Sequence, residues 1–372
     1  MQHLLSIQAL RALAALMVVF AHAQNDAGRT ALESGASFNR IFPLPWASGV
    51  DLFFVVSGFV MVFASEKMFA APGGAMQFMG RRIARIVPMY WLATAVFLFA
   101  ALRGAAAGKV LPPTLGEIVS SFAFFPWPRT LDGAPRPVHS LGWTLEYEMF
   151  FYVVFACFIW LPRTRAVAGV AMTLAALVAF NALAAPHNVA LAYWSDPIVL
   201  EFALGMGLAL AYRRGLRLPS PISFALVFAA LVALALDPMN SAAEPYDAVD
   251  PNGFLRLLSW GLPMAAIFAA ATLRAPAMTS GRLMQAAAKV GDASYALYLF
   301  HPLAIIVLRK LWLAAHLGRS LGYWPLVVVS TLASVALALA IYRWIEKPVT
   351  RKAQSLLLPG PIGGAAPAAA RP

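Results

Sequence analysis

Hydrophobic residues in this sequence gather in long, nearly uninterrupted runs that alternate with shorter polar connections. Ten of the runs approach the roughly 20 apolar residues that an α-helix needs to cross a bilayer. They cover residues 4–22, 49–65, 86–102, 143–161, 166–185, 197–212, 221–236, 256–273, 292–316 and 325–344. The pattern predicts an all-α, polytopic membrane bundle of about ten transmembrane helices. Residues 1–350 would form this transmembrane domain, and residues 351–372 a low-complexity, disordered cytoplasmic tail.

Composition places the chain outside the soluble class. Of its 372 residues, 61% are hydrophobic and only 12% are charged, and the mean hydropathy is +0.73. The single cysteine, Cys157, lies in an apolar run, which excludes a disulfide framework and predicts a packed core thiol. The net charge of +12 is spread between membrane spans, where basic residues report orientation rather than nucleic-acid binding. We therefore expect membrane lipids, and no nucleic acid, among the partners.

The distribution of lysine and arginine predicts how the bundle is oriented. Ten spans place 17 of the 28 basic residues on the side of both termini, 10 on the opposite side, and Arg11 within the first span. Basic residues are enriched on the cytoplasmic side of membrane proteins. Both termini are thus expected in the cytoplasm of a bacterial-type inner membrane, with His22 near the outer face.

The first apolar run carries two ionisable residues, Arg11 near its middle and His22 at its end. At 100° per residue, eleven residues bring both side chains to one face, about 16 Å apart. One interpretation is that Arg11 extends to the lipid surface and His22 marks the aqueous end of the helix. The other is that the two form a functional pair, because charged side chains inside a membrane usually face a polar interior.

Two further spans carry charges with alternative interpretations. Asp51 begins the second span, either as a favourable acid at a helix start or as a residue with a chemical role. Ser57, farther along that span, fits close helix packing better than nucleophilic catalysis. Arg81 and Arg85 lie four residues apart, hence on one helical face. They would bind a phosphate or pyrophosphate group, or simply anchor the span at the cytoplasmic surface.

The segment WTLEYEMFFY contains the acid most difficult to explain by packing alone, Glu148. Glu148 shares a face with Tyr152, whereas Glu146 points away and would stabilise the first turn. A carboxylate inside an apolar run is suited to act as an acid, a base or the partner of a histidine.

Weaker candidates follow toward the C-terminus. Glu201 is an acid inside a short span, or it begins that helix at the membrane surface. The stretch KVGDASYALYLFHPL places Tyr295 and His301 in the ninth span, with His301 directly before a proline. His301 is either a structural or a catalytic histidine. The motif YRWIEKP fits an interfacial anchor at the end of the last span.

Motifs for nucleotide hydrolysis, dinucleotide redox chemistry, zinc proteolysis and serine hydrolysis are missing from the sequence. The ordered motifs that are present resemble the acyltransferase-3 family of integral membrane acyltransferases. They are Arg11 to His22, GVDLFFVVSGFV, Arg81 and Arg85 beside RIVPMYW, WTLEYEMFFY, GDASYALYLFHPL and YRWIEKP, and together they extend over residues 4–348. In the usual pattern of the family, the motif with Glu148 reads W-S-L-x-x-E-E, but here Met149 replaces the second glutamate.

The resemblance implies a ten-helix bundle that transfers an acyl group, usually acetyl from acetyl-CoA, to a hydroxyl of a carbohydrate. The WTLEYEMFFY form is similar to that of exopolysaccharide acetyltransferases. The resemblance further implies that His22 is the catalytic histidine, paired with Arg11. The expected partners are acyl-CoA and a cell-surface carbohydrate, such as exopolysaccharide, O-antigen or a lipid-linked glycan.

The mechanistic hypothesis is that Arg81 and Arg85 hold the phosphates of acyl-CoA while its arm extends toward His22, the general base. Glu148 or Asp51 would orient His22, and Arg11 would stabilise negative charge on the thioester or hold the donor. No metal is expected to take part. Supporting residues are Trp143, Tyr152, Tyr295 and His301.

A transporter for a lipid-linked sugar or a small solute is the alternative, because buried charges also line transport paths. Transporters often contain internal repeats, and none is evident in this sequence. A structural subunit of a polysaccharide-export complex is a third interpretation, which the many intramembrane charges disfavour. The sequence leaves the oligomeric state open.

Overall fold

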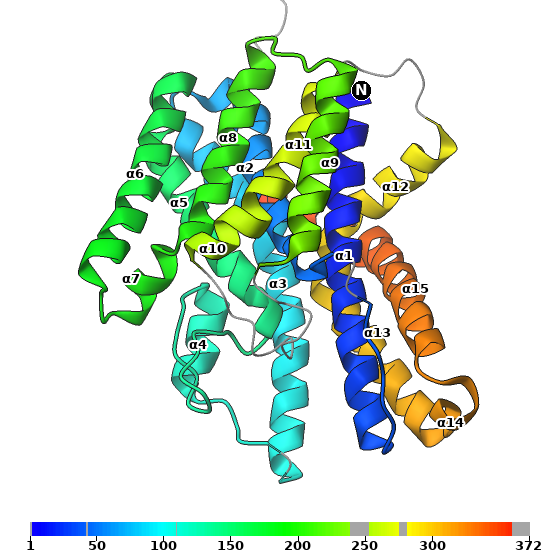
Figure 1. Cartoon of the computed structure of the whole chain (residues 1–372). Helices are drawn as coiled ribbons and strands as arrows, with labels where there is room; N and C mark the ends of the chain where they lie inside the picture. The colour runs from blue at the N-terminus through cyan, green and yellow to red at the C-terminus, as the bar shows by residue number, and fades with distance from the viewer. Residues whose placement is uncertain (1, 42–43, 109, 239–252, 275–280, 359–372) are drawn as a thin grey trace, which may run out of the picture.

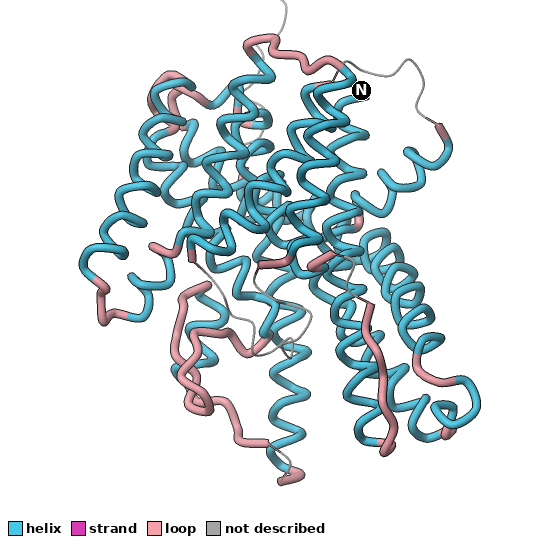
Figure 2. Tube along the Cα trace, viewed as in Figure 1, coloured by secondary structure: helices cyan, strands magenta, loops and turns pink. Residues whose placement is uncertain are grey.

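The computed structural model describes residues 2–41, 44–108, 110–238, 253–274 and 281–358. These residues form helices and connecting loops, and no strand occurs among them (Figure 2). The helices are α1 (Gln2–Glu33), α2 (Gly49–Ala64), α3 (Gly74–Ala106), α4 (Leu115–Ala123), α5 (Trp143–Phe158), α6 (Arg163–Ala184), α7 (Val189–Trp194), α8 (Leu200–Arg213), α9 (Ser220–Leu236), α10 (Phe254–Arg256), α11 (Leu262–Leu273), α12 (Arg282–Asp292), α13 (Ser294–Ala314), α14 (Leu317–Leu321), α15 (Trp324–Ile341) and α16 (Lys347–Leu357). π-Helical turns at Leu257–Gly261 and Tyr342–Glu346 join α10 to α11 and α15 to α16.

All ten predicted apolar runs coincide with helices of this bundle. Eight helical segments of the described chain are long and apolar enough to cross a membrane. The predicted runs 197–212 and 221–236 correspond to the shorter α8 and α9, of 14 and 17 residues. The predicted all-α membrane bundle is confirmed. The predicted tail starts as helix, since α16 extends to Leu357, and its residues 359–372 lie outside the described part.

Helix α1 is much longer than the hydrophobic pattern indicated. It contains 32 residues and is about 48 Å long, compared with a hydrocarbon core of about 30 Å, and it runs the length of the bundle (Figure 1). The helix continues because Ala23, Ala27 and Ala31, spaced four apart, are buried in a cluster with aromatic residues of the α13–α15 region. His22 therefore lies eleven residues before the end of α1, and the expected position at the helix end was wrong.

Glycines let the central helices approach closely. A side chain at Gly58 of α2 would overlap the backbone of Phe202 in α8, and one at Gly205 of α8 would overlap the backbone of Val55 in α2. The two helices thus touch backbone to backbone, as small residues allow in membrane bundles. Similarly, Gly49 brings the start of α2 against Ala14, Met17 and Val18 of α1. These contacts fix α2 between α1 and α8.

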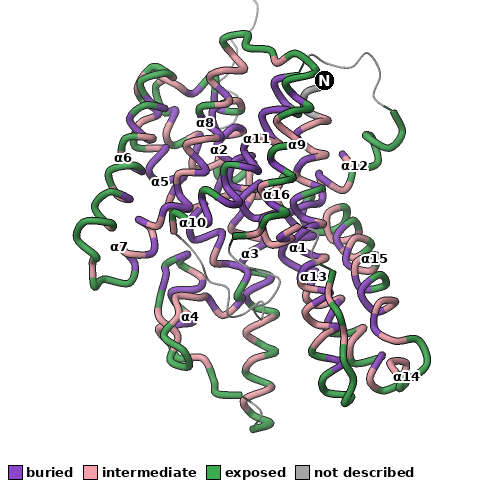
Figure 3. Tube along the Cα trace, in the orientation of Figure 1, coloured by how far each residue is buried: buried purple, intermediate pink, exposed green. Residues whose placement is uncertain are grey.

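Buried residues concentrate in the centre of the bundle, while the peripheral helices expose much of their surface (Figure 3). The exposed residues of those outer faces include large apolar side chains, among them Phe99, Met172, Phe228 and Leu332. Such a surface is stable against lipid but not against water. Cys157 is also exposed, so the predicted core thiol was wrong. The reason is that α5 is apolar on its outer face too, and an apolar run cannot distinguish a core-facing position from a lipid-facing one.

We expect that Gly205→Ala lowers the thermal unfolding midpoint in detergent by several degrees, because the new methyl group forces α2 and α8 apart, a change that costs about 1–3 kcal/mol. Gly207→Ala is the matched control on the same helix. No atom lies within 4 Å of a side chain built there, and alanine favours helix over glycine. Equal midpoints for the two variants would contradict the close packing of α2 on α8.

Candidate active site

An elongated cavity of about 280 Å³ lies between α1, α2, α3, α5 and α13. Residues of α2 from Val50 to Ala64 line it, so it extends about 20 Å along that helix. Its charged lining residues are Arg11, Arg82, Arg85 and Glu148. Three guanidiniums and one carboxylate thus surround a space inside the membrane-spanning bundle. Such residues are costly in lipid, and they are retained there mostly for function.

Arg11 belongs to a polar network in the cavity wall. Its Nη1 donates a hydrogen bond of 2.9 Å to Oε1 of Gln8, whose Nε2 donates in turn to Oδ1 of Asp292 at 2.6 Å. Glu346 is buried nearby and interacts electrostatically with both Arg85 and Arg11. The structure therefore favours a polar interior over the lipid surface for Arg11. It also places the glutamate of YRWIEKP in this network, so that motif is more than the interfacial anchor we predicted.

Helix α3 contributes a different pair of arginines from the one predicted. Arg82 and Arg85, three residues apart, line the cavity, whereas Arg81 is not among the lining residues. The buried guanidinium of Arg82 lies 5.6 Å from the ring centre of Phe78 and 6.0 Å from that of Tyr152. The spacing of three satisfies the same-face rule as well as the spacing of four, so the sequence alone does not choose Arg82 over Arg81.

Glu148 is held by hydrogen bonds from two hydroxyls. Ser57 of α2 donates to Oε1 of Glu148 at 2.9 Å, and Tyr152 donates to the same oxygen. The shared face of Glu148 and Tyr152 is thereby confirmed. Ser57, predicted only to aid packing, is a polar partner of the carboxylate. Tyr295 also lines the cavity, and its hydroxyl donates to the Ile86 carbonyl at 2.8 Å.

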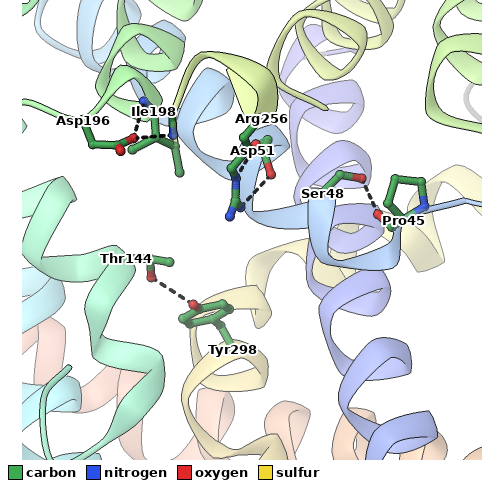
Figure 4. Close-up of polar contacts among 9 residues, drawn as sticks. Pro45, Ser48, Asp51, Thr144, Asp196, Ile198, Arg256 and Tyr298 are labelled. Carbon is green, nitrogen blue, oxygen red and sulfur yellow. Dashed lines mark hydrogen bonds and ion pairs between the residues drawn. The ribbon is translucent and has the colours of Figure 1, made fainter. Parts of the chain in front are cut away.

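The end of the cavity opposite Arg82 is formed by Thr144 and Tyr298, whose hydroxyl oxygens are 2.9 Å apart (Figure 4). On α13, His301 lies about one helical turn beyond Tyr298. The buried ring of His301 lies next to the ring of His22, with 5.0 Å between their centres. Neither histidine is among the residues that line the cavity. The pair lies about one helical turn beyond Tyr298, and about 16 Å along α1 from Arg11.

Both histidines are anchored in the same way. Nδ1 of His22 is 2.9 Å from the carbonyl oxygen of Val18, and Nδ1 of His301 is 2.9 Å from that of Leu297. A carbonyl oxygen only accepts hydrogen bonds, so Nδ1 carries the hydrogen in each neutral ring. Nε2 is left with a lone pair in both rings, which is the form that a general base requires.

Asp51 lies in a separate buried cluster. It accepts two hydrogen bonds from Arg256, of 3.0 and 2.9 Å, and both side chains are almost fully buried (Figure 4). The Arg256 guanidinium lies between Trp143 and Trp260, 5.6 and 5.0 Å from their ring centres. Glu201 is also buried here and interacts with Asp51 and Arg256. Asp51 and Trp143 thus belong to a buried cluster beside the cavity, and no local pattern in the sequence indicates that Arg256 is the partner of Asp51.

Comparison with known proteins identifies the family of this chain. Residues 4–343 match the family model described as an acyltransferase domain. The chain belongs to this acyltransferase family. It is 32% identical over 320 residues to the exopolysaccharide production protein ExoZ of Rhizobium meliloti (strain 1021), covering 86% of this chain and 94% of that protein. No solved structure matches.

The buried pair of Asp51 and Arg256 gives a test by double-mutant cycle. Asp51→Leu or Arg256→Met alone should lower the free energy of unfolding by about 3–5 kcal/mol, because each leaves a buried charge without its partner. The double variant should be more stable than either single one. Asp132→Ala, which removes the exposed ion pair with Arg136, is the control and should change stability by less than about 1 kcal/mol. Additive losses, measured by unfolding in detergent, would contradict the pairing.

Proposed function

We propose that this acyltransferase transfers an acetyl group from acetyl-CoA to a hydroxyl of a cell-surface carbohydrate of the exopolysaccharide or O-antigen class. The observation that supports it most is the elongated cavity, with guanidiniums along one part and two histidine bases next to its far end. A long donor with a phosphorylated end and a reactive end fits such a space. The relative's name, exopolysaccharide production protein, supports a carbohydrate acceptor.

In this proposal, Arg82 and Arg85 bind phosphate oxygens of acetyl-CoA, because guanidinium groups match phosphate in geometry and charge. The donor arm follows the apolar lining of α2, including Val56 and Phe53, toward Thr144 and Tyr298. Arg11 lies about 16 Å from His22 along α1, and its guanidinium bonds to Gln8, on the side of Arg11 that faces away from His22. We therefore assign Arg11 to the donor rather than to the developing oxyanion.

The chemistry itself rests on His22. Its Nε2 removes the proton from the acceptor hydroxyl, the hydroxyl oxygen attacks the thioester carbonyl, and the carbon–sulfur bond breaks. The thiolate then takes up the proton, so no net proton is released. The Val18 carbonyl, rather than Glu148 or Asp51, holds the His22 ring in the required tautomer. Glu148 instead contacts Ser57 and Tyr152 near the donor, and Asp51 pairs with Arg256.

We infer that the end of the bundle with the N-terminus faces the cytoplasm, the source of acetyl-CoA. The excess of basic residues in the connections on that side supports this orientation. Both termini then lie in the cytoplasm of an inner membrane. The acceptor would approach from the opposite side, where α4 and α14 lie (Figure 1).

The donor site can be tested by acetyl-CoA binding to the purified protein in lipid nanodiscs. We expect that Arg82→Gln and Arg85→Gln each weaken binding about tenfold or more, because each removes a charged donor to phosphate. Arg81→Gln is the matched control on the same helix, outside the cavity lining, and should bind as tightly as the wild type. Weakened binding in Arg81→Gln alone would favour a surface site and contradict the cavity as the donor site.

The role of His22 as the base can be tested by measuring the transfer of radiolabelled acetyl groups from acetyl-CoA to exopolysaccharide. The exopolysaccharide is taken from the source cells and treated with mild alkali, which removes its esters. His22→Ala should lower the transfer rate by about 10²-fold or more, whereas His187→Ala, in an exposed loop, should not change it. Full activity of His22→Ala would exclude it as the base. If wild-type protein binds a lipid-linked sugar but transfers no label, the transporter alternative is favoured instead.

A further inference from the structure

His301 is completely buried, yet its Nε2 has no hydrogen-bond partner among the residues that the structure describes. A buried acceptor without a donor is unfavourable, and such groups are few in folded proteins. Nδ1 of His301 donates to the Leu297 carbonyl. Rotating the ring to find a partner for Nε2 would therefore break this hydrogen bond. Packing alone therefore does not account for a histidine at this position.

The neighbour of His301 suggests what donates to it. The His22 ring lies 5.0 Å away, centre to centre, and comes from a different helix. Neutral His22 carries its only hydrogen on Nδ1, which faces Val18. After His22 has taken a proton, Nε2 becomes a donor as well. The protonated ring would then provide the hydrogen bond that Nε2 of His301 lacks.

The surroundings of His22 make such a partner necessary. The imidazolium that forms during the reaction is a positive charge inside a membrane bundle, and Arg29 on the same helix opposes it electrostatically. His139 also interacts electrostatically with His301. A neutral lone pair next to His22 stabilises the imidazolium without adding a second charge.

We propose that His301 is a positioning residue that shares the proton which His22 removes from the acceptor hydroxyl. This inference rests on the proposed function. The hydroxyl O–H bond breaks and the proton binds Nε2 of His22, where it forms a hydrogen bond to Nε2 of His301. The ester bond forms as the carbon–sulfur bond breaks, and the leaving thiolate takes the proton from the pair. Both rings return to the neutral state, so the step requires no other reactant.

Three substitutions distinguish this role from simple packing. Glutamine places an acceptor oxygen near the position of Nε2, asparagine places it near that of Nδ1, and alanine provides none. In the label-transfer assay with alkali-treated exopolysaccharide, His301→Ala and His301→Asn should lower kcat on the order of a hundredfold, while the KM values for donor and acceptor stay within about twofold. His301→Gln should have a kcat at least about tenfold higher than that of His301→Ala. His187→Ala serves as the control.

The outcomes separate this inference from the proposed function. Wild-type protein without transfer activity contradicts the proposed function itself. Active wild type with full kcat in His301→Ala, a loss confined to KM, or equal kcat in the glutamine and asparagine variants overturns only the role of His301. If the variants do not fold, ¹⁵N NMR of histidine-labelled wild-type protein decides. The proposal requires neutral His301 with its hydrogen on Nδ1, and a hydrogen on Nε2 would overturn it.

Discussion

The structure depends on satisfying polar and charged side chains inside a membrane, where water provides no partners. Several such side chains in the core are tied to a residue distant in sequence: Gln8 to Asp292, Ser57 to Glu148, and Asp51 to Arg256. Leaving one of these groups unpaired in lipid is costly, so the contacts determine which helices lie side by side. The interactions that hold the bundle together therefore also shape the cavity, because several of the same residues line it.

Much of the fold could be predicted from the sequence because the thickness of the bilayer sets the length that an apolar run needs in order to cross it as a helix. All ten predicted runs coincide with helices. Residues 23–33 follow the first apolar run and are more polar, so the pattern does not predict that the helix continues through them. The buried alanines that keep α1 helical become visible only when α13 and α15 pack against them. Cys157 was assigned to the core for the converse reason, since an apolar sequence is compatible with both lipid and protein as neighbours.

The candidate site shows a similar division. Helical spacing correctly placed Glu148 beside Tyr152, because both lie on one helix. Spacing could not choose between Arg81 and Arg82 as the partner of Arg85, since both satisfy the same-face rule and only the neighbouring helices decide which face borders the cavity. Contacts between separate elements, such as Asp51 with Arg256 or His22 with His301, have no local signal in a single sequence.

The position of His22 within α1 determines how far the donor and the acceptor of the proposed reaction must each enter the bundle. A histidine at the outer surface would require the donor arm to traverse the whole bilayer. His22 instead lies well inside a helix about 48 Å long, next to the end of a cavity that extends about 20 Å along α2. In the proposed reaction, the donor arm then has to reach from the arginines only to this end of the cavity. The acceptor hydroxyl must enter the bundle to meet it, which favours transfer to the hydroxyl over hydrolysis of the thioester.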